Sequence, residues 1–329
     1  MLTVMMATHN GAGWIGQCLD SFCALETPPG GYKLVIIDNA STDGTSDIVR
    51  AYRDRLPVTL LFQPKPGKNR ALNLGLEHIE GDLVVFTDDD VIAAPDWLVQ
   101  WRRAADQFPE FGIFGGTINP YWRKTPPEWL LEIIEVAMVY ALTGAQHQDG
   151  PIRPGLIFGP NMMVRAQLFK GGQRFDETIG PDGTSSYMMG SETSFTEAMA
   201  AQGVHCRFVS QPTVCHIIRE GQVDPEWVAA RYNRFGRSMH KGLEKDYEGP
   251  RLFGAPRYQI RIVLELGLTQ AFYFIVRNKK LFYKYKFLYN QKKRFARTDK
   301  QKEINIGHQL KVARGSIRRQ LANGNKVLK

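Results

Sequence analysis

The sequence lacks a hydrophobic run long enough to cross a bilayer, which takes about 20 apolar residues. The longest candidate, Ile262 to Val276, is shorter and contains Glu265. The apolar start, Met1 to Ala7, has no basic segment before it and ends at His9-Asn10-Gly11, so it predicts a buried strand and not a signal peptide. We expect a cytoplasmic protein.

Cysteine is also scarce. The four cysteines form no Cys-x-x-Cys pair; they are Cys18, Cys23, Cys206 and Cys215. A chain of 329 residues with 43% hydrophobic content can bury a core without disulfide bonds. We therefore expect reduced thiols, as in the cytosol.

Acidic residues are rare at the C-terminal end. Residues 277–329 contain 17 Lys or Arg but only Asp299 and Glu303, whereas the remainder has more acids than bases within a total net charge of +9. Such asymmetry favours an anionic partner, either a membrane surface or a polyanion. The composition changes near Gly249-Pro250, which predicts a domain at residues 1–249 and a helical, basic, aromatic region at residues 250–329.

Short apolar strands alternate with amphipathic helices through the first part of the chain. The expected strands are Leu2–Ala7, Lys33–Ile37, Val58–Phe62 and Leu83–Thr87, and the expected helices are Trp14–Leu25, Ser46–Leu56, Asn69–His78 and Trp97–Phe108. This alternation predicts an α/β fold with a mostly parallel central sheet flanked by helices.

The second part of the body is less regular. Its expected elements are strand Ile113–Ile118, helix Glu128–Leu142, strand Asn161–Arg165, helix Glu192–Gln202 and strand Cys206–Val209. Long Pro- and Gly-rich connections at Asn119–Pro160 and Gly180–Gly190 are typical of functional loops.

Three consecutive carboxylates, Asp88 to Asp90, follow the fourth strand. Like charges at this spacing repel one another and raise each other's pKa, unless a cation lies among them. Carboxylate oxygens suit Mg²⁺ or Mn²⁺, and open parallel sheets bind ligands at the carboxyl ends of their strands. The alternative is a solvated acidic turn.

Several motifs together resemble glycosyltransferase family 2. They are Thr8-His9-Asn10, Val35 to Thr45 (VIIDNASTDGT), Gly67 to Asn73 (GKNRALN) and Phe86 to Asp90 (FTDDD), in matching order over roughly residues 1–240. The resemblance implies a GT-A fold with an inverting transfer from a nucleotide sugar, UDP-linked by preference. It also implies that Thr8, Asp38 and Arg70 contact the base and ribose, that Asp88 lies on the ribose side, and that Asp90 binds Mn²⁺ or Mg²⁺, with Asp89 sharing either role. Alternatively, Asp38 forms a turn and Arg70 lies on a helix surface.

An inverting transfer needs a base that takes the acceptor proton. Gly190-Ser191-Glu192 resembles the family's glycine-acid-acid segment, which places Glu192 at the catalytic base, although Ser191 replaces an acid. The alternative is that Glu192 only stabilises the start of a helix.

Asn161, His216 and a series of arginines are further candidates for binding. Asn161 could orient a sugar hydroxyl or be a buried, satisfied amide, and His216 could add a metal contact or be structural. Arg231, Arg234 and Arg237 recur every three residues on a predicted helix, which suits phosphate oxygens or a solvated face. We assign Arg234 to the nucleotide sugar.

Other functions fit less well. A nucleotidyltransferase needs a basic, Gly-rich N-terminal signature, but Thr8–Gly13 has no Lys or Arg. Arg231 to Phe235 only faintly resembles the Gln-x-x-Arg-Trp motif of processive members, which argues against a processive synthase. Nucleic-acid binding through the basic tail is an alternative of another class, and such binding would fall steeply with salt.

Aromatic and basic residues are interleaved between Phe272 and Tyr289, as in helices that lie on a membrane interface. We therefore expect a peripheral protein on the inner face of the plasma membrane, acting on a saccharide or lipid-linked acceptor. Alternatively, these aromatic residues pack on the body or on a second subunit of a homo-oligomer.

Overall fold

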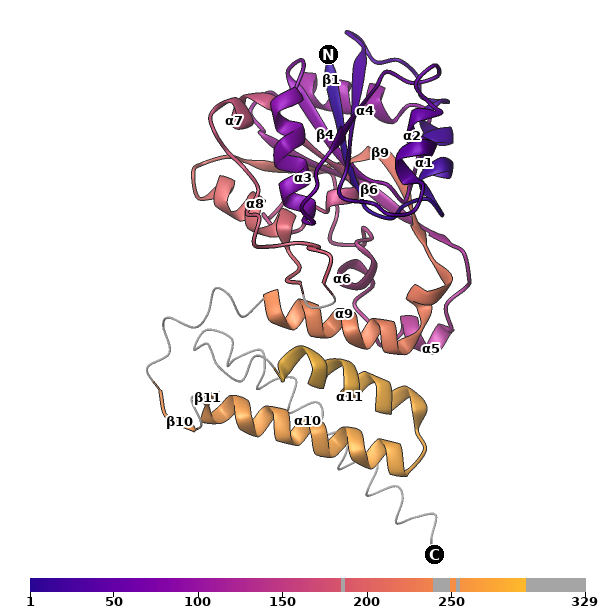
Figure 1. Ribbon diagram of the computed structural model, residues 1–329. Coiled ribbons are helices and arrows are strands. Elements are labelled where there is room, and N and C mark those ends of the chain that lie inside the picture. Colours follow the sequence, from indigo (N-terminus) through magenta and orange to yellow (C-terminus); the bar gives the residue numbers. More distant parts are fainter. Residues whose placement is uncertain (185–186, 239–248, 253–254, 294–329) are drawn as a thin grey trace, which may run out of the picture. The chain divides into compact units, whose positions relative to one another are not determined.

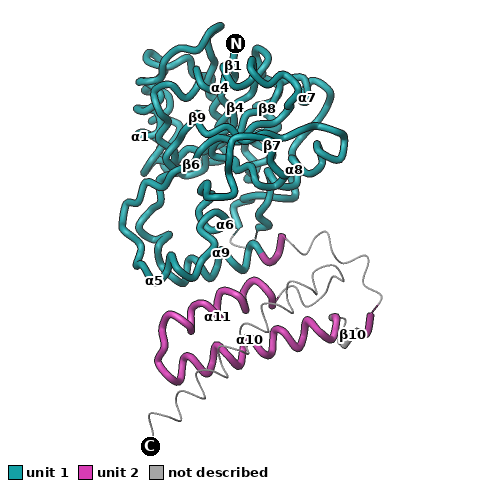
Figure 2. The backbone as a smooth tube through the Cα atoms, turned by 180° about the vertical axis from the view of Figure 1, so that it is seen from behind, with its two compact units in different colours: residues 1–235 teal, residues 236–329 magenta. Residues whose placement is uncertain are grey.

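The structure is a computed structural model that describes residues 1–184, 187–238, 249–252 and 255–293. Contacts within the chain divide it into two compact units, Met1–Phe235 and Gly236–Lys329 (Figure 2). Each unit is described by itself. The domain boundary near residue 249 stays a prediction.

A nine-stranded sheet forms the centre of the first unit (Figure 1). Its order is β3-β2-β1-β4-β8-β6-β9-β5, and β7 pairs with β9. Neighbouring strands from β3 to β4 are parallel, whereas β8 is antiparallel to both β4 and β6, so the sheet is mixed. The strands are β1 (Leu2–Thr8), β2 (Tyr32–Asp38), β3 (Val58–Phe62), β4 (Leu83–Asp88), β5 (Val91–Ala93), β6 (Ile113–Trp122), β7 (Gly150–Pro151), β8 (Met162–Arg165) and β9 (Cys206–Ile218).

Helices cover both faces of this sheet (Figure 1). Because side chains alternate along a strand, Val35 and Ile37 of β2 point to the face covered by α3, α7 and α8. The opposite face carries α1 and α4, whose Phe22 and Trp97 rings lie 5.7 Å apart. The helices are α1 (Ile15–Phe22), α2 (Thr45–Arg50), α3 (Lys68–Gly75), α4 (Trp97–Gln107), α5 (Glu128–Leu131), α6 (Val136–Tyr140), α7 (Ala166–Lys170), α8 (Ser191–Ala200) and α9 (Pro225–Ser238), with 3₁₀ turns at η1 (Leu76–His78), η2 (Gly159–Asn161) and η3 (Glu220–Val223).

An aromatic cluster fixes α7 and α8 against β4. The ring of Phe86 on β4 packs edge-on against Phe169 and Phe175, at centroid distances of 5.6 and 5.3 Å. Phe195 of α8 lies 4.6 Å from the Phe175 ring. Such buried rings dominate core energetics. The start of α8 is therefore held near the carboxyl end of β4.

The elements differ from the sequence-based prediction in several places. The helix expected at Glu128–Leu142 consists of two short helices, because the chain turns after Leu131 and Ala141 ends α6 with a φ of 53°. The last core strand is one strand of 13 residues that continues through Pro212. Strand β5 was not predicted, because three residues carry too little periodicity.

The second unit contains a helical hairpin. Helices α10 (Arg257–Ile275) and α11 (Lys279–Lys292) follow the short pair β10 (Arg251–Leu252) and β11 (Ala255–Pro256). Asn278 caps α11, since its side chain accepts a hydrogen bond of 3.1 Å from the Leu281 N–H. No helix within the described residues is both long enough and apolar enough to cross a membrane.

Candidate active site

The turn between β4 and β5 presents the three aspartates. Strand β5 is antiparallel to β9, with Val91 opposite His216. This register places the Asp90 carboxylate next to the imidazole, with Oδ1 3.3 Å from Nε2 of His216. The sequence pattern did not predict β5 or its register, so the proximity of Asp90 to His216 is known from the structure alone.

A backbone contact orients the His216 ring. Nδ1 lies 2.8 Å from the carbonyl oxygen of Tyr140, which can only accept, so Nδ1 carries the proton and Nε2 faces Asp90. Burial opposes the charged form of both groups. The mutual attraction outweighs it, so the pKa of Asp90 is lowered and that of His216 is raised.

Asp89 has a different environment. Burial, followed by the charge of Asp90, raises the pKa of Asp89 to about 7. The Thr8 hydroxyl at the end of β1 donates a hydrogen bond to its Oδ2. Gly11 makes room for this carboxylate, because a Cβ there would lie 2.5 Å from Oδ2. Thr8 thus contacts the aspartate turn directly.

Lys68 connects two carboxylates that lie far apart in the sequence. Its Nζ is 2.6 Å from Oδ1 of Asp88 and 3.4 Å from Oε1 of Glu192. Burial lowers the pKa of this ammonium, but Asp88 and then Glu192 outweigh it, so the net shift is upward. Lys68 was not among the predicted site residues. Its position at the start of α3, inside the Gly67 to Asn73 motif, was the available signal.

Glu192 lies in the first turn of α8, after Gly190 in the left-handed conformation. Gly159 allows its carboxylate to approach the backbone, because a Cβ at this position would be 2.2 Å from Oε1. Glu192, Lys68 and Asp88 line one small pocket, together with Leu72, Phe86, Thr87, Gly159, Met162 and Phe175. The predicted base and the first aspartate of the triplet therefore meet in one cleft.

Asp38 ends β2 and shapes the following turn. Its carboxylate accepts a 2.9 Å hydrogen bond from the Ser41 N–H and a second one from the Ser46 hydroxyl. Asn39 continues the network, since its Oδ1 accepts from the Gly67 N–H at 2.7 Å. This geometry is the turn-forming alternative, and it leaves the predicted nucleotide contact of Asp38 untested.

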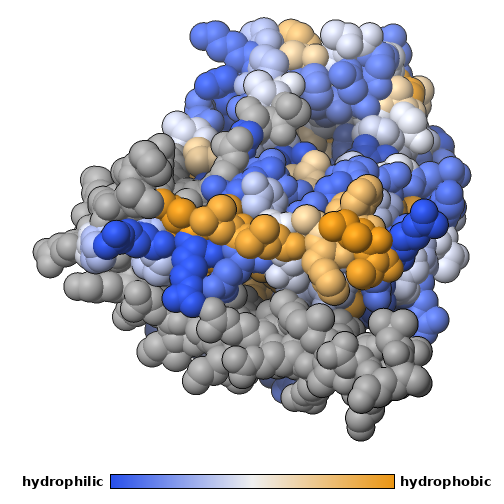
Figure 3. Space-filling model, turned by 90° about the horizontal axis from the view of Figure 1, so that it is seen from below, coloured by the Kyte–Doolittle hydropathy of each residue, from blue (hydrophilic) through white to orange (hydrophobic). Residues whose placement is uncertain are grey.

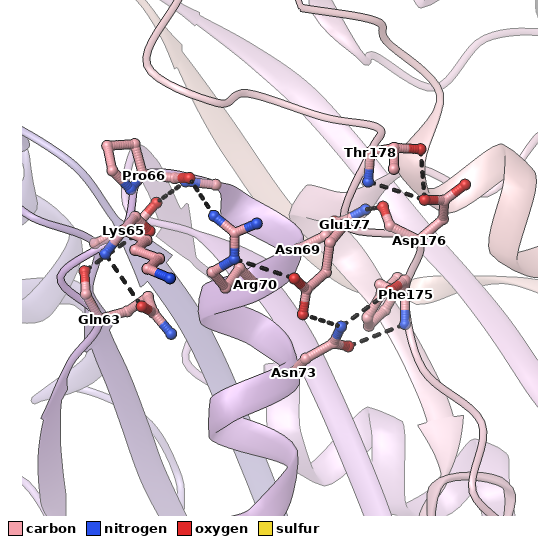
Figure 4. A network of polar contacts seen from close by, with 12 residues as sticks. Gln63, Lys65, Pro66, Asn69, Arg70, Asn73, Phe175, Asp176, Glu177 and Thr178 are labelled. Atoms are coloured by element: carbon pink, nitrogen blue, oxygen red, sulfur yellow. Dashed lines mark hydrogen bonds and ion pairs between the residues drawn. The ribbon is translucent and has the colours of Figure 1, made fainter.

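Arg70 ties α3 to the loop that precedes α8 (Figure 4). Its Nε donates to Glu177 at 3.0 Å, and Nη1 donates to the Pro66 carbonyl at 3.0 Å. On the next turn of α3, Asn73 exchanges two 3.0 Å hydrogen bonds with the backbone of Phe175. Arg70 is a structural link here, and its predicted role toward the base and ribose is not tested.

Asn161 has no exposed surface. Its amide donates to the carbonyls of Thr117 and Pro212 at 2.9 and 2.8 Å, and its oxygen accepts from the indole of Trp97 at 2.8 Å. Both amide hydrogens are used within the protein. The geometry matches the buried, satisfied amide and offers no N–H for a sugar hydroxyl.

Arg234 lies on α9 beside an aromatic residue from the loop before α8. Its guanidinium is 5.3 Å from the ring centre of Tyr187 and 6.0 Å from that of Trp227. Arg231, one turn earlier, has its Nη1 3.5 Å from the Tyr187 hydroxyl. Aromatic rings therefore partly cover the face that the alternative interpretation left in solvent, and the predicted contact of Arg234 with the nucleotide sugar is not tested.

Asp90 and His216 are the pair best suited to a divalent cation. Within the residues that the structure describes, no group of three or more His, Cys, Asp or Glu side chains is placed to hold a metal ion. Carboxylate and imidazole are both accepted by Mn²⁺. Two protein ligands leave room in the coordination sphere for water and phosphate oxygens.

Comparison with known proteins is consistent with this geometry. A model of the family described as Glycosyl transferase family 2 matches residues 3–172. The poly(ribitol-phosphate) beta-N-acetylglucosaminyltransferase TarS of Staphylococcus aureus (strain Mu50) is 32% identical over 180 residues, which cover 51% of this chain and 31% of that protein. Validoxylamine A glucosyltransferase of Streptomyces hygroscopicus subsp. limoneus is 32% identical over 100 residues, 30% of this chain and 22% of that protein. The matches thus span less than a third of these relatives' length.

Solved structures share the fold. The mannosyltransferase PcManGT from Pyrobaculum calidifontis, in complex with GDP-Man and Mn²⁺, superposes with a TM-score of 0.54 at 22% identity, over 76% of this chain and 65% of that one. S. aureus TarS 1–349 in complex with UDP gives 0.52 at 15% identity, over 89% of each chain. These likenesses confirm the GT-A fold, and the match of the family model shows that this chain is a glycosyltransferase that belongs to glycosyl transferase family 2.

Proposed function

We propose that this glycosyltransferase moves a sugar, with inversion, from a nucleoside diphosphate sugar to an acceptor hydroxyl, and that it depends on a divalent metal. The observation that carries the proposal is the cleft in which Lys68 joins Asp88 to Glu192. Asp88, the first residue of the aspartate turn, lines this pocket, and so does Glu192, a single carboxylate suited to act as a base.

The donor set at the aspartate turn fits Mn²⁺ or Mg²⁺. Asp90 and His216 would hold the ion, because their ligand atoms face each other and the Tyr140 carbonyl fixes the imidazole with Nε2 turned inward. When bound, the metal supplies positive charge that stabilises the departing diphosphate. The remaining chemistry belongs to side chains of the chain itself.

Glu192 accepts the proton of the acceptor hydroxyl at its carboxylate. Three features position this carboxylate. It lies in the first turn of α8, it faces the ammonium of Lys68, and the missing side chain of Gly159 lets it approach the backbone there. The ammonium of Lys68 holds the carboxylate in place, since its Nζ lies 3.4 Å from Oε1 of Glu192. A single base of this kind supports one displacement and hence inversion.

The nucleotide is proposed to bind along the edge formed by the ends of β1, β2 and β4. Thr8, Asp38, Asp88 and Asp89 lie at or directly after these strand ends, and Arg70 lies in the first turn of α3. Open sheets bind ligands at such carboxyl edges. We favour UDP, in line with the UDP complex of TarS, while PcManGT was solved with GDP-Man.

The biological setting is proposed from the relatives. TarS of S. aureus and the poly(ribitol-phosphate) beta-glucosyltransferase of Bacillus spizizenii, by their names, glycosylate a phosphate polymer. We therefore place this chain in bacterial polysaccharide or glycoconjugate synthesis, on the cytoplasmic side, with a saccharide or lipid-linked acceptor.

The proposal is tested by screening nucleotide sugars for thermal stabilisation with Mn²⁺, Mg²⁺ or a chelator, since ligands that bind the folded state raise its apparent stability. The best donor is then incubated with saccharide acceptors, and the anomeric configuration of the product is determined by NMR. Stabilisation that persists under chelation contradicts the metal. A product that retains the donor's configuration contradicts inversion.

A further inference from the structure

The helical hairpin of the second unit buries some of its large apolar and aromatic side chains and exposes others. Ile262, Leu266, Tyr273 and Tyr285 are buried in the seam between α10 and α11. The Tyr273 and Tyr285 rings stack there at 5.4 Å. These residues stabilise the hairpin. They are therefore not available to an external partner, although the sequence pattern alone did not distinguish them from the rest.

Another side of α10 carries large apolar residues in solvent. Leu264, Leu268, Phe272 and Ile275 recur at intervals of four, four and three, so they lie on one stripe of the helix. We call these four residues the α10 band. They are 60%, 72%, 40% and 75% exposed, and Phe274 and Val276 at the helix end are 69% and 51% exposed. Figure 3 shows hydrophobic side chains gathered in an elongated strip. Contiguous apolar surface of this kind marks an interaction site.

Basic residues border the α10 band at both ends. Arg257 and Arg261 precede it on the same side of the helix, and Arg277, Lys279 and Lys280 follow it directly; all five are exposed. Over residues 257–293 there are nine Lys or Arg and one acid, Glu265. Long basic side chains can extend to phosphate groups while their stems rest on apolar surface.

We infer that the α10 band and its flanking cations form a docking surface for an anionic phospholipid membrane. The pattern is that of a helix lying in the interface plane, with apolar residues among the acyl chains and cations at the level of the head groups. Spanning is not required for this mode of binding.

The cations beside the α10 band favour a membrane over a second copy of the chain as its partner. An isologous contact through the α10 band would bring the two sets of cations together, and the one acid of the hairpin, Glu265, already pairs with Arg261. An anionic leaflet instead attracts each of the cations. The inference is independent of the proposed reaction, because vesicle binding needs neither donor nor acceptor.

The test is co-sedimentation of the full chain with vesicles of phosphatidylcholine alone or mixed with phosphatidylglycerol. We expect binding to the mixed vesicles at low salt, weak binding to the neutral ones and release at high salt. In Leu268→Ser/Ile275→Ser, the partition coefficient should fall at least about tenfold, because both side chains would lie among acyl chains. The matched control is Phe62→Ser/Tyr121→Ser in the first unit, whose side chains are also exposed, and it should bind as the unmodified protein does.

A second pair of variants tests the cations. Lys279→Ser/Lys280→Ser should weaken binding to anionic vesicles and reduce its salt dependence, with unchanged circular dichroism. Sedimentation velocity without lipid tests whether a second copy of the chain covers the α10 band instead. The inference is overturned if the chain ignores anionic vesicles, if it binds neutral vesicles equally well, or if Leu268→Ser/Ile275→Ser dissolves a dimer while vesicle binding persists.

Discussion

The two units place energetically unfavourable groups differently: the first buries charged side chains, and the second exposes apolar ones. In the first unit, charged groups are taken out of water but matched: Lys68 with Asp88 and Glu192, and Asp90 with His216. In the second unit, apolar groups of the α10 band remain in water. A buried ion pair is stable only in a specific geometry, whereas the binding energy of an apolar stripe grows with the area that it buries. Single substitutions should therefore be severe in the first region and graded in the second.

The largest effect is expected from Glu192→Gln. The amide keeps the shape but cannot accept the proton, so turnover should fall by roughly 10²–10⁴-fold while donor affinity persists. Rates and donor binding are measured by product formation and calorimetry. Glu197→Gln is the matched control, because Glu197 is exposed on the same helix. Equal rates in the two variants would rule out the assigned base.

Asp90→Ala tests the metal pair. Removing a residue that hydrogen-bonds to a metal ligand lowers the metal affinity by about 10–100-fold. Removing the ligand itself should lower it further. We expect nucleoside diphosphate binding to lose its dependence on Mn²⁺ in calorimetry. The fold should persist in circular dichroism, with a lower melting temperature because His216 loses its buried partner. Asp54→Ala, at an exposed position, serves as the control. A variant that still responds to chelation would contradict the assignment.

Gly159→Ala should displace the base without removing it. The added methyl would lie 2.2 Å from Oε1 of Glu192, and the flexible carboxylate can move away. A misplacement of about 1 Å can cost up to about 100-fold in rate. We expect kcat to fall and donor affinity to hold. Gly221→Ala, which meets no atom within 4 Å, should leave kcat unchanged. A normal kcat in Gly159→Ala would mean that the carboxylate position is not critical.

The sequence predicted local elements well and long-range pairs poorly. The strands from Leu2 to Thr87 were placed to within a residue or two, because each has its own apolar pattern and turn residues. The approach of Lys68 to Glu192 spans 124 positions and has no local signal. The pairing of Asp90 with His216 likewise depends on β5, which is too short to show periodicity. The carboxylate triplet itself predicted a metal site at Asp88 to Asp90, but the choice of Asp90 within it and the role of Glu192 came from the family resemblance.

Asn161→Ala compares structural and catalytic roles inside the first unit. The change leaves two carbonyls and the Trp97 indole without their buried partner, and an unsatisfied buried polar group costs about 1–3 kcal/mol. Urea unfolding should show this loss, whereas kcat at a permissive temperature should change little. Asn119→Ala, at an exposed position on β6, should leave stability nearly unchanged. A large kcat loss with normal stability would restore the predicted contact with the sugar.

The smallest effect is expected from Leu268→Ser, measured as the free energy of unfolding of the full chain. Leu268 is 72% exposed, so a polar residue there removes little packing, and such surface changes usually stay within about 0.5 kcal/mol. Leu266, two residues earlier on the same helix, is 7% exposed and belongs to the hairpin seam. Leu266→Ala should cost about 2–5 kcal/mol in the unfolding of the second unit. Hydrogen exchange along α10 and α11 resolves that unit from the first. If Leu268→Ser destabilised the hairpin as much as Leu266→Ala, the α10 band would be a packing surface of the protein itself, and the contrast between the two units would fail.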